Sequence, residues 1–362
     1  MIHGEGARAT YLNHQPVVDR PDRQVYIAYH AVFGGPAVQK TVPFSEANGA
    51  VWSEANTLER LKHPRLVETR EAQFDSAPGF VTFVMPFYPC GSIQDGLSGG
   101  KTFSIGSAMQ IGLDLLEALA FLHDRFNLVH RDVKSGNVFL GGEPARGFLG
   151  DLGSIARVDD KVCAALEGFT PIYLDPATRL GGPLTMRSDQ YCAGVTIYEM
   201  VNNRLVFEGV DMVKAESRLI AGKAAFGPIC FAPHVPDRLR RLLRKAMCVD
   251  PTKRFNSVTD FATAMRQLNV TDWTPPLAGL EGEWVGSRRG NRCADVSLKI
   301  EGVPVMRGTN AGQIRLTALR QTRGGWMRFG AGDRIVGPQD YTAAASFFAD
   351  VEAKVAQLPA AF

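Results

Sequence analysis

The most constraining feature of this sequence is a polar segment that follows a strongly apolar helix near the middle of the chain. The apolar residues between Met109 and Leu122 recur at helical spacing, so a helix is expected there. The polar segment that follows reads His130-Arg131-Asp132-Val133-Lys134-Ser135-Gly136-Asn137-Val138-Phe139-Leu140. The chain must therefore present a carboxylate, an ammonium group and an amide together in one short stretch.

These side chains suit the transfer of a phosphoryl group. Such a reaction needs a carboxylate to orient the attacking hydroxyl, cations to balance phosphate charge, and ligands for Mg²⁺. Asp132 can supply the carboxylate, Lys134 can neutralise the γ-phosphate, and Asn137 can hold a metal ion. A second metal ligand, Asp151, follows in the triplet Asp151-Leu152-Gly153.

The two segments resemble the catalytic loop H-R-D-x-K-x-x-N and the metal loop D-F-G of the Hanks-type (eukaryotic-like) serine/threonine protein kinases. Leu152 replaces the phenylalanine and keeps an apolar contact. The alternative is a chance tripeptide in a loop, which the number of matching positions and the spacing to Asp151 disfavour. The resemblance implies an α+β, bilobal fold with a small β-rich N-lobe and a larger helical C-lobe.

The resemblance extends upstream to a nucleotide site. Lys40 ends Ala37-Val38-Gln39-Lys40, at the place of the family's V-A-I-K strand. The resemblance implies that Lys40 contacts the α- and β-phosphates of ATP and pairs with Glu54, on a helix expected over residues 52–61. Two unrelated surface charges are the alternative for this pair.

The stretch Phe83–Tyr88 resembles the kinase hinge. In that reading Met85 guards the back pocket, while the Pro86 carbonyl and the Tyr88 amide bond the adenine edge. Phe139 packs beneath the purine. The residues implied to bind the nucleotide are Val25, Val38, Lys40, Met85, Pro86, Tyr88 and Phe139.

Downstream, Thr170 opens Thr170-Pro171-Ile172-Tyr173, which resembles the substrate-docking loop. With Lys134 it indicates serine/threonine rather than tyrosine specificity. Asp189 opens the next apolar helix, where the family uses a carboxylate to brace the catalytic loop. Asp175-Pro176-Ala177 stands where the family has A-P-E, so the arginine matched by Arg254 lacks its glutamate, and Asp175 is a possible substitute.

The Gly-rich phosphate loop of the family is missing. Aligning Val25 with the strand after that loop places Val18, Arg20 and Arg23 at the three glycine positions. Glycine lets backbone amides approach phosphates closely, so we expect a more open lid and weakened ATP affinity. The two arginines supply cationic contacts or are simply solvated; the sequence favours neither.

The interval between Ser154 and Thr170 contains no serine, threonine or tyrosine. Kinases with an arginine at the Arg131 position usually neutralise it with a phosphate in this loop. Fixed carboxylates at Asp159, Asp160 or Glu167 are candidate replacements. The sequence therefore predicts activity without phosphorylation of this interval.

The resemblance ends near residue 268, and we expect a kinase-like domain (11–270), a linker (271–282) and a small basic β-rich domain (283–362) closed by a helix. The linker is suggested by Pro275, Pro276 and Gly279. No family is recognised for the last segment. Its arginines and tryptophans allow a nucleic-acid surface, but we favour a small β domain whose outward positions are basic and which docks a partner or substrate.

The remaining sequence features are weaker. No apolar run approaches the roughly 20 residues that cross a bilayer, and the first residues do not resemble a secretory signal, so no membrane partner and a cytoplasmic location are expected. The six cysteines are scattered, which fits reduced thiols. The preferred function is an ATP- and Mg²⁺-dependent serine/threonine kinase acting on protein; the alternatives are a pseudokinase binding module and a small-molecule phosphotransferase.

Overall fold

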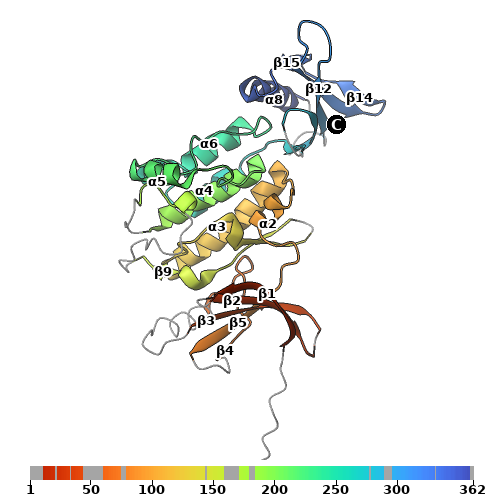
Figure 1. The fold of residues 1–362 in the computed structure, drawn as a ribbon. Coiled ribbons are helices and arrows are strands. Elements are labelled where there is room, and N and C mark those ends of the chain that lie inside the picture. The colour runs from red at the N-terminus through yellow and green to blue at the C-terminus, as the bar shows by residue number, and fades with distance from the viewer. Residues whose placement is uncertain are drawn as a thin grey trace, which may run out of the picture.

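The structure, a computed structural model, describes most of the chain. The described residues are 11–20, 23–32, 34–43, 60–74, 79–142, 145–158, 171–178, 184–276, 279–288, 296–330 and 332–358. Figure 1 shows three successive parts: an N-terminal sheet, a block of helices, and a C-terminal sheet with one helix against it. The expected α+β, bilobal arrangement is confirmed. Most of the helix expected at 52–61, with Glu54, lies outside the described residues, as does Thr170.

The N-terminal sheet is antiparallel, with the strand order β1-β2-β3-β5-β4. Its strands are β1 (Tyr11–Arg20), β2 (Arg23–His30), β3 (Pro36–Pro43), β4 (Glu71–Phe74) and β5 (Phe80–Pro86). Short alternating runs in the sequence predict strands at 24–30, 37–42 and 80–87, and β2, β3 and β5 confirm them, whereas β1 and β4 were not expected. Side chains alternate along β3, so Val38, Lys40 and Val42 share one face while Gln39 is buried on the other.

The missing glycine loop is replaced by a hairpin. β1 and β2 pair along their length, with Val18 opposite Val25 and Arg20 opposite Arg23. Only residues 21 and 22 separate the two strands, and they lie outside the described residues along with the side chains of Arg20 and Arg23. Arg20 therefore ends β1 and Arg23 begins β2, opposite each other at one end of this strand pair.

The helical lobe is built around two long helices. Its helices are α2 (Ile93–Ser98), α3 (Ile105–Phe126), α4 (Met186–Asn202), α5 (Met212–Ile220), α6 (Asp237–Ala246) and α7 (Val258–Arg266). α4 is buried at every position from Ser188 to Val201, which explains why it is apolar nearly all round. It begins at Met186, so Asp189 lies in its first turn rather than opening it. α2 and α5 were not expected.

Short strands frame the polar loop of residues 130–137. β6 (Leu128–Val129) pairs with β9 (Ala156–Arg157), and β7 (Val138–Leu140) pairs with β8 (Gly147–Leu149). β6 follows α3 closely, and the loop runs from the end of β6 to the start of β7. This arrangement holds both ends of the loop against the helical lobe.

The sequence analysis expected no segment apolar enough to cross a membrane, and the composition of one helix differs from that expectation. Among the described residues, α3 is long and apolar enough to cross a membrane, although no such segment was expected from the sequence. In the structure α3 packs against α4 and α7 at the centre of the helical lobe, and more than half of its apolar window is buried. A core helix meets the same criteria as a membrane span, so α3 is explained by its place in the lobe.

The C-terminal part is a six-stranded antiparallel sheet that packs against one helix (Figure 1). Its elements are β10 (Asp272–Thr274), β11 (Gly282–Arg288), β12 (Val296–Pro304), β13 (Ile314–Thr322), β14 (Gly325–Arg328), β15 (Arg334–Val336) and α8 (Tyr341–Ala356). Trp284 on β11 packs edge-on against Phe348 of α8. The expected β-rich unit and closing helix are both present.

The expected linker is partly wrong, because residues 272–274 form β10 and pair with β11. Trp273 is fully buried against Phe348, and its indole N–H donates to Glu352 at 3.0 Å. Burial of this large ring outweighs the turn signals of the prolines that follow. Asp272 also accepts the Gly106 amide at 2.6 Å, which satisfies a free N–H in the first turn of α3. The C-terminal sheet is therefore fastened directly to the helical lobe.

Several basic residues of the C-terminal part are paired with carboxylates. Arg288 meets Glu352 at 3.2 Å, and Arg334 meets Asp350 at 2.7 Å. Lys299 lies 2.6 Å from Glu301 and Arg328 lies 3.3 Å from Asp333. This pairing lowers the unpaired positive charge that a nucleic-acid surface would use.

Candidate active site

Asp189 holds the start of the 130–137 loop. Its carboxylate accepts the backbone amides of His130 at 2.8 Å and Arg131 at 2.9 Å, and the ring of His123 at 2.8 Å. Arg131 adopts a φ of 74°, a left-handed conformation that is costly for a residue with a side chain. Three hydrogen bonds to one buried carboxylate oppose that cost. This is the bracing role expected for Asp189 from the sequence.

Asp132 is linked to the other two polar residues of the loop. Lys134 donates to both of its carboxylate oxygens, at 2.9 and 2.8 Å. The side-chain amide of Asn137 donates to the Asp132 carbonyl and to its carboxylate, both at 2.8 Å. These bonds fix the direction of the carboxylate, which is only partly exposed. The three residues therefore form one hydrogen-bonded group.

Lys40 and Asp151 meet across the two lobes. The Lys40 Nζ atom lies 2.6 Å from Asp151 Oδ1, although the residues are 111 positions apart. Asp151 follows β8 and has φ 55° and ψ 58°, again left-handed. The ion pair is partly shielded, with side chains 19% and 21% exposed. The partner expected for Lys40, Glu54, lies outside the described residues, so that pairing remains a prediction.

A cavity of about 170 Å³ lies between the N-terminal sheet and the helical lobe. Seven of the residues implied by the resemblance line it: Val25, Val38, Lys40, Met85, Asn137, Phe139 and Asp151. Val42 and Val67 also line it and were missed. Val42 could have been found, because it follows Lys40 by two on the same strand face. Val67 lies in an irregular segment without a local signal.

Pro86 and Tyr88 are not among the residues that line this cavity. Pro86 ends β5, and the Tyr88 ring stacks on Phe139 with ring centres 5.5 Å apart. Their expected contacts with adenine use backbone atoms, and those contacts remain predictions. The stacking nevertheless places this stretch beside the apolar floor of the cavity.

The polar side of the cavity has the chemistry of a magnesium site. Asn137 uses its amide nitrogen on Asp132, so the amide oxygen is the atom left for a cation. Asp151 adds a carboxylate to the same cavity. Mg²⁺ prefers such oxygen ligands and is commonly bound by one or two protein groups together with substrate phosphates. The donor set therefore fits Mg²⁺.

A buried network behind the loop was missed by sequence reasoning. The Tyr173 hydroxyl donates to Glu199 of α4, with its oxygens at 2.7 and 2.9 Å, and lies 2.8 Å from the Ser135 hydroxyl. The Val206 amide also donates to Glu199, at 2.8 Å. The network connects the 130–137 loop, the segment after Thr170 and the end of α4. The sequence signal that could have revealed this network is the carboxylate of Glu199 inside an otherwise apolar helix.

Glu199→Gln is expected to flatten the pH dependence of stability. Burial raises the pKa of Glu199 from 4.5 to about 7. Because the folded-state pKa is the higher one, this group's contribution is complete below pH 4.5 and is lost as the pH rises through 7. The shift corresponds to roughly 3 kcal/mol. Denaturant unfolding at pH 5 and pH 8 measures it, and the exposed Glu216→Gln is the control. An unchanged difference between the two pH values in Glu199→Gln would contradict the assignment.

Arg254 pairs with the carboxylate of Asp175. It forms a two-pronged pair with Asp175, at 2.7 and 2.6 Å, in which both side chains are almost completely buried. Its remaining N–H groups donate to the carbonyls of Cys248, Arg187 and Val249. The substitution of Asp175 for the missing glutamate, expected as a possibility, is confirmed. The segment 171–178 is thus tied to the end of the helical lobe.

Comparison with known proteins shows which family the chain is similar to. The protein kinase domain family matches residues 24–273. A probable serine/threonine-protein kinase PknB of Bifidobacterium longum is 25% identical over 66% of this chain and 37% of its own length. The kinase pkn2 of Myxococcus xanthus is 33% identical over 62% and 28%, respectively. The kinase PksC of Streptomyces coelicolor is 28% identical over 67% and 45%.

The chain thus spans less than half the length of these three relatives. The family match itself covers more than half of the chain and includes every described residue of the group at Lys40, Asp132, Asn137 and Asp151. The fold, the order of the motifs and the convergence of these side chains agree with it. The chain belongs to the protein kinase family.

Proposed function

We propose that this chain is an active serine/threonine kinase that moves the γ-phosphate of ATP onto a protein hydroxyl with the help of Mg²⁺. The observation that carries the proposal is the meeting of distant side chains. Lys40, Asn137 and Asp151 line one cavity, and Asp132 is hydrogen-bonded to Asn137. A binding module would not need this complete set.

Each polar group has a defined part in this proposal. Asp132 orients the attacking hydroxyl and accepts its proton, and Lys134, bonded to the same carboxylate, balances charge on the phosphate. Asn137 and Asp151 hold Mg²⁺, which neutralises phosphate charge when bound. Lys40 contacts the α- and β-phosphates. Glu54 positions Lys40, and Thr170 bonds Asp132 and Lys134.

The apolar half of the cavity takes the adenine. Val25 and Val38 cover the ring from the N-terminal sheet, and Phe139 lies beneath it. Met85 closes the back of the cavity. The backbone groups of Pro86 and Tyr88 bond the adenine edge.

Protein substrates bind at the segment that Thr170 opens, with the C-terminal part as a second docking surface. We divide the chain accordingly into a kinase unit ending near residue 270 and the C-terminal sheet with α8. The use of ATP and the free thiols of Cys90, Cys192, Cys230 and Cys248 fit a cytoplasmic protein.

The direct test is incorporation of labelled γ-phosphate into a panel of protein substrates, followed by phosphoamino-acid analysis. We expect label on serine or threonine, none on tyrosine, and complete loss with a magnesium chelator. Peptide mass spectrometry of the active preparation is expected to show no phosphate between Ser154 and Thr170. A phosphate at Thr170 that activity requires would contradict the regulatory part. Absence of transfer to every substrate would favour the pseudokinase.

ATP is expected to bind weakly, because a hairpin without glycines cannot wrap the phosphates closely. A dissociation constant of roughly 0.1–1 mM is expected, at the weak end of usual substrate affinities. Titration calorimetry with Mg²⁺ and a non-hydrolysable ATP analogue measures it. Nanomolar binding would show that the hairpin closes the site as well as a glycine loop does.

A further inference from the structure

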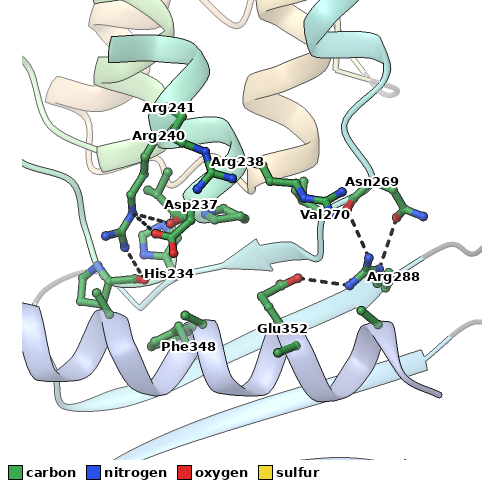
Figure 2. Close-up of a pocket in the computed structure, with 17 residues that line it drawn as sticks. His234, Asp237, Arg238, Arg240, Arg241, Asn269, Val270, Arg288, Phe348 and Glu352 are labelled. Atoms are coloured by element: carbon green, nitrogen blue, oxygen red, sulfur yellow. Dashed lines mark hydrogen bonds and ion pairs between the residues drawn. The ribbon is translucent and has the colours of Figure 1, made fainter. Parts of the chain in front are cut away.

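A second cavity, of about 250 Å³, lies between the helical lobe and the C-terminal part. The residues Pro233–Pro236 and α6 form one wall, and α8 forms the opposite wall (Figure 2). It shares no lining residue with the cavity at Lys40 and Asp151. The two cavities are therefore separate sites, and the inference about the second does not rest on the proposed kinase activity.

The α8 wall consists mainly of small apolar side chains, with Glu352 as its carboxylate. Ala345, Ala349 and Ala353 recur every four residues, so they lie along one face of the helix beside Phe348. Val270 adds a further apolar surface. Methyl-sized side chains on one helix leave space that larger residues would fill. An apolar group bound there would be removed from water, which favours binding.

Positive charge gathers on the α6 side of the cavity. The lining contains the four arginines Arg238, Arg240, Arg241 and Arg288 against the two carboxylates Asp237 and Glu352. Arg240 is occupied by the backbone carbonyls of residues 232, 233 and 235, and Arg288 is paired with Glu352.

Arg238 and Arg241 remain available. Both are exposed, and within the described ranges no carboxylate lies at ion-pair distance from either. α6 begins at Asp237, and its N-cap residue Pro236 makes no side-chain cap, so the first amides of the helix lack that partner. Figure 2 shows the arginines of α6 on one side of the gap and α8 on the other. An anion between them would meet two uncompensated arginine charges and the uncapped amides at the start of α6, where Asp237 is the one carboxylate of the first turn.

His234 supplies an independent observation. It is 2% exposed, lines the cavity, and neither ring nitrogen has a hydrogen-bond partner among the residues that the structure describes. The Val201 carbonyl is near the ring but does not reach hydrogen-bonding geometry. A buried polar group without a partner costs roughly 1–3 kcal/mol, so a partner is expected in the cavity. Burial lowers the pKa of His234 to about 4, so the neutral ring offers one donor and one acceptor.

We infer that this cavity binds a small organic anion with an apolar body. The acidic group lies at Arg238 and Arg241, a polar atom meets His234, and the apolar body lies on the alanine face of α8. Because such a ligand touches both the helical lobe and the C-terminal part, its binding stabilises the contact between them. A water molecule alone would satisfy His234 but neither the arginines nor the alanine face.

The test uses the full chain and anilinonaphthalene sulfonate, a fluorescent aromatic anion, as the probe. We expect saturable binding of one probe per chain. Ala349→Leu, which fills the cavity, and the double variant Arg238→Gln/Arg241→Gln are each expected to weaken it at least tenfold. Two controls are expected to keep the probe affinity within twofold of wild type. One is the charge-matched double variant Arg125→Gln/Arg266→Gln, and the other is Val38→Phe, which fills the nucleotide cavity. Octanoate should displace the probe, and octanol at the same concentration should not.

Three outcomes would overturn the inference. They are the absence of saturable binding, loss of binding in Val38→Phe with retention in Ala349→Leu, and equal displacement by octanol and octanoate. Thermal unfolding of each variant checks that it is folded. If Ala349→Leu fails to fold, the arginine double variant decides, because both of its side chains are exposed and its loss of charge leaves the packing intact.

Discussion

Asp132→Asn is expected to reduce the rate of phosphate transfer by roughly 10²–10⁴-fold, the usual contribution of a positioned general base. The amide has the same shape, so it can still accept from Asn137, but it cannot take a proton from the attacking hydroxyl. It also loses the charge that Lys134 contacts from 2.8 Å. Initial rates at saturating ATP measure the effect, which should appear in kcat.

ATP affinity separates loss of chemistry from loss of structure in this variant. Asp132 is not among the lining residues of the nucleotide cavity, so the dissociation constant of ATP is expected to change by less than about threefold, under 1 kcal/mol. The control is Asp211→Asn, an exposed carboxylate that caps α5 and that asparagine replaces equally well as a cap. Retention of more than a tenth of the wild-type rate in Asp132→Asn would rule out the proposed role.

Asp175→Ala is expected to destabilise the helical lobe by roughly 3–5 kcal/mol, as is typical when one partner of a buried ion pair is removed. The Arg254 guanidinium cannot reach water, because its side chain is fully buried. Two of its N–H groups, which now lie 2.7 and 2.6 Å from Asp175 oxygens, would have no acceptor. Denaturant unfolding monitored by circular dichroism measures the loss.

A graded series tests the cause of this destabilisation. Asp175→Asn keeps one acceptor oxygen and removes the charge, so an intermediate loss is expected. The control Glu208→Ala breaks an exposed pair with Arg204 at 3.9 Å, which should cost no more than about 1 kcal/mol. Equal effects of Asp175→Ala and Glu208→Ala would mean that the buried pair contributes little.

The active-site residues were largely predictable because they occur in short motifs in a set order. Asp132, Lys134 and Asn137 lie within six residues, and the backbone of one loop brings them together. Asp151 follows at the family's spacing. The alternation of β3 also predicts that Val38 and Lys40 face the same side. Local geometry sufficed in each case.

The buried network at Glu199 was not predictable in this way. Glu199 lies in an apolar helix, and its partners Tyr173 and Val206 come from two other segments, while Ser135, which bonds Tyr173, comes from a third. No spacing rule connects these positions. Similarly, Trp273 precedes two prolines and resembles a linker residue, yet the C-terminal sheet buries it completely. Tertiary packing overrode the local turn signal in that case.

The sequence by itself determined the kinase-like arrangement, the polar loop, the absence of a glycine-rich loop, and the lack of a phosphorylatable residue between Ser154 and Thr170. Only the tertiary structure decided that Asp175 pairs with Arg254, that β10 ties the C-terminal sheet to α3, and that His234 faces a cavity shared by both parts. The reason is physical. Periodicity and loop length constrain neighbouring residues, whereas contacts between distant segments depend on how whole elements pack and in which direction each side chain points.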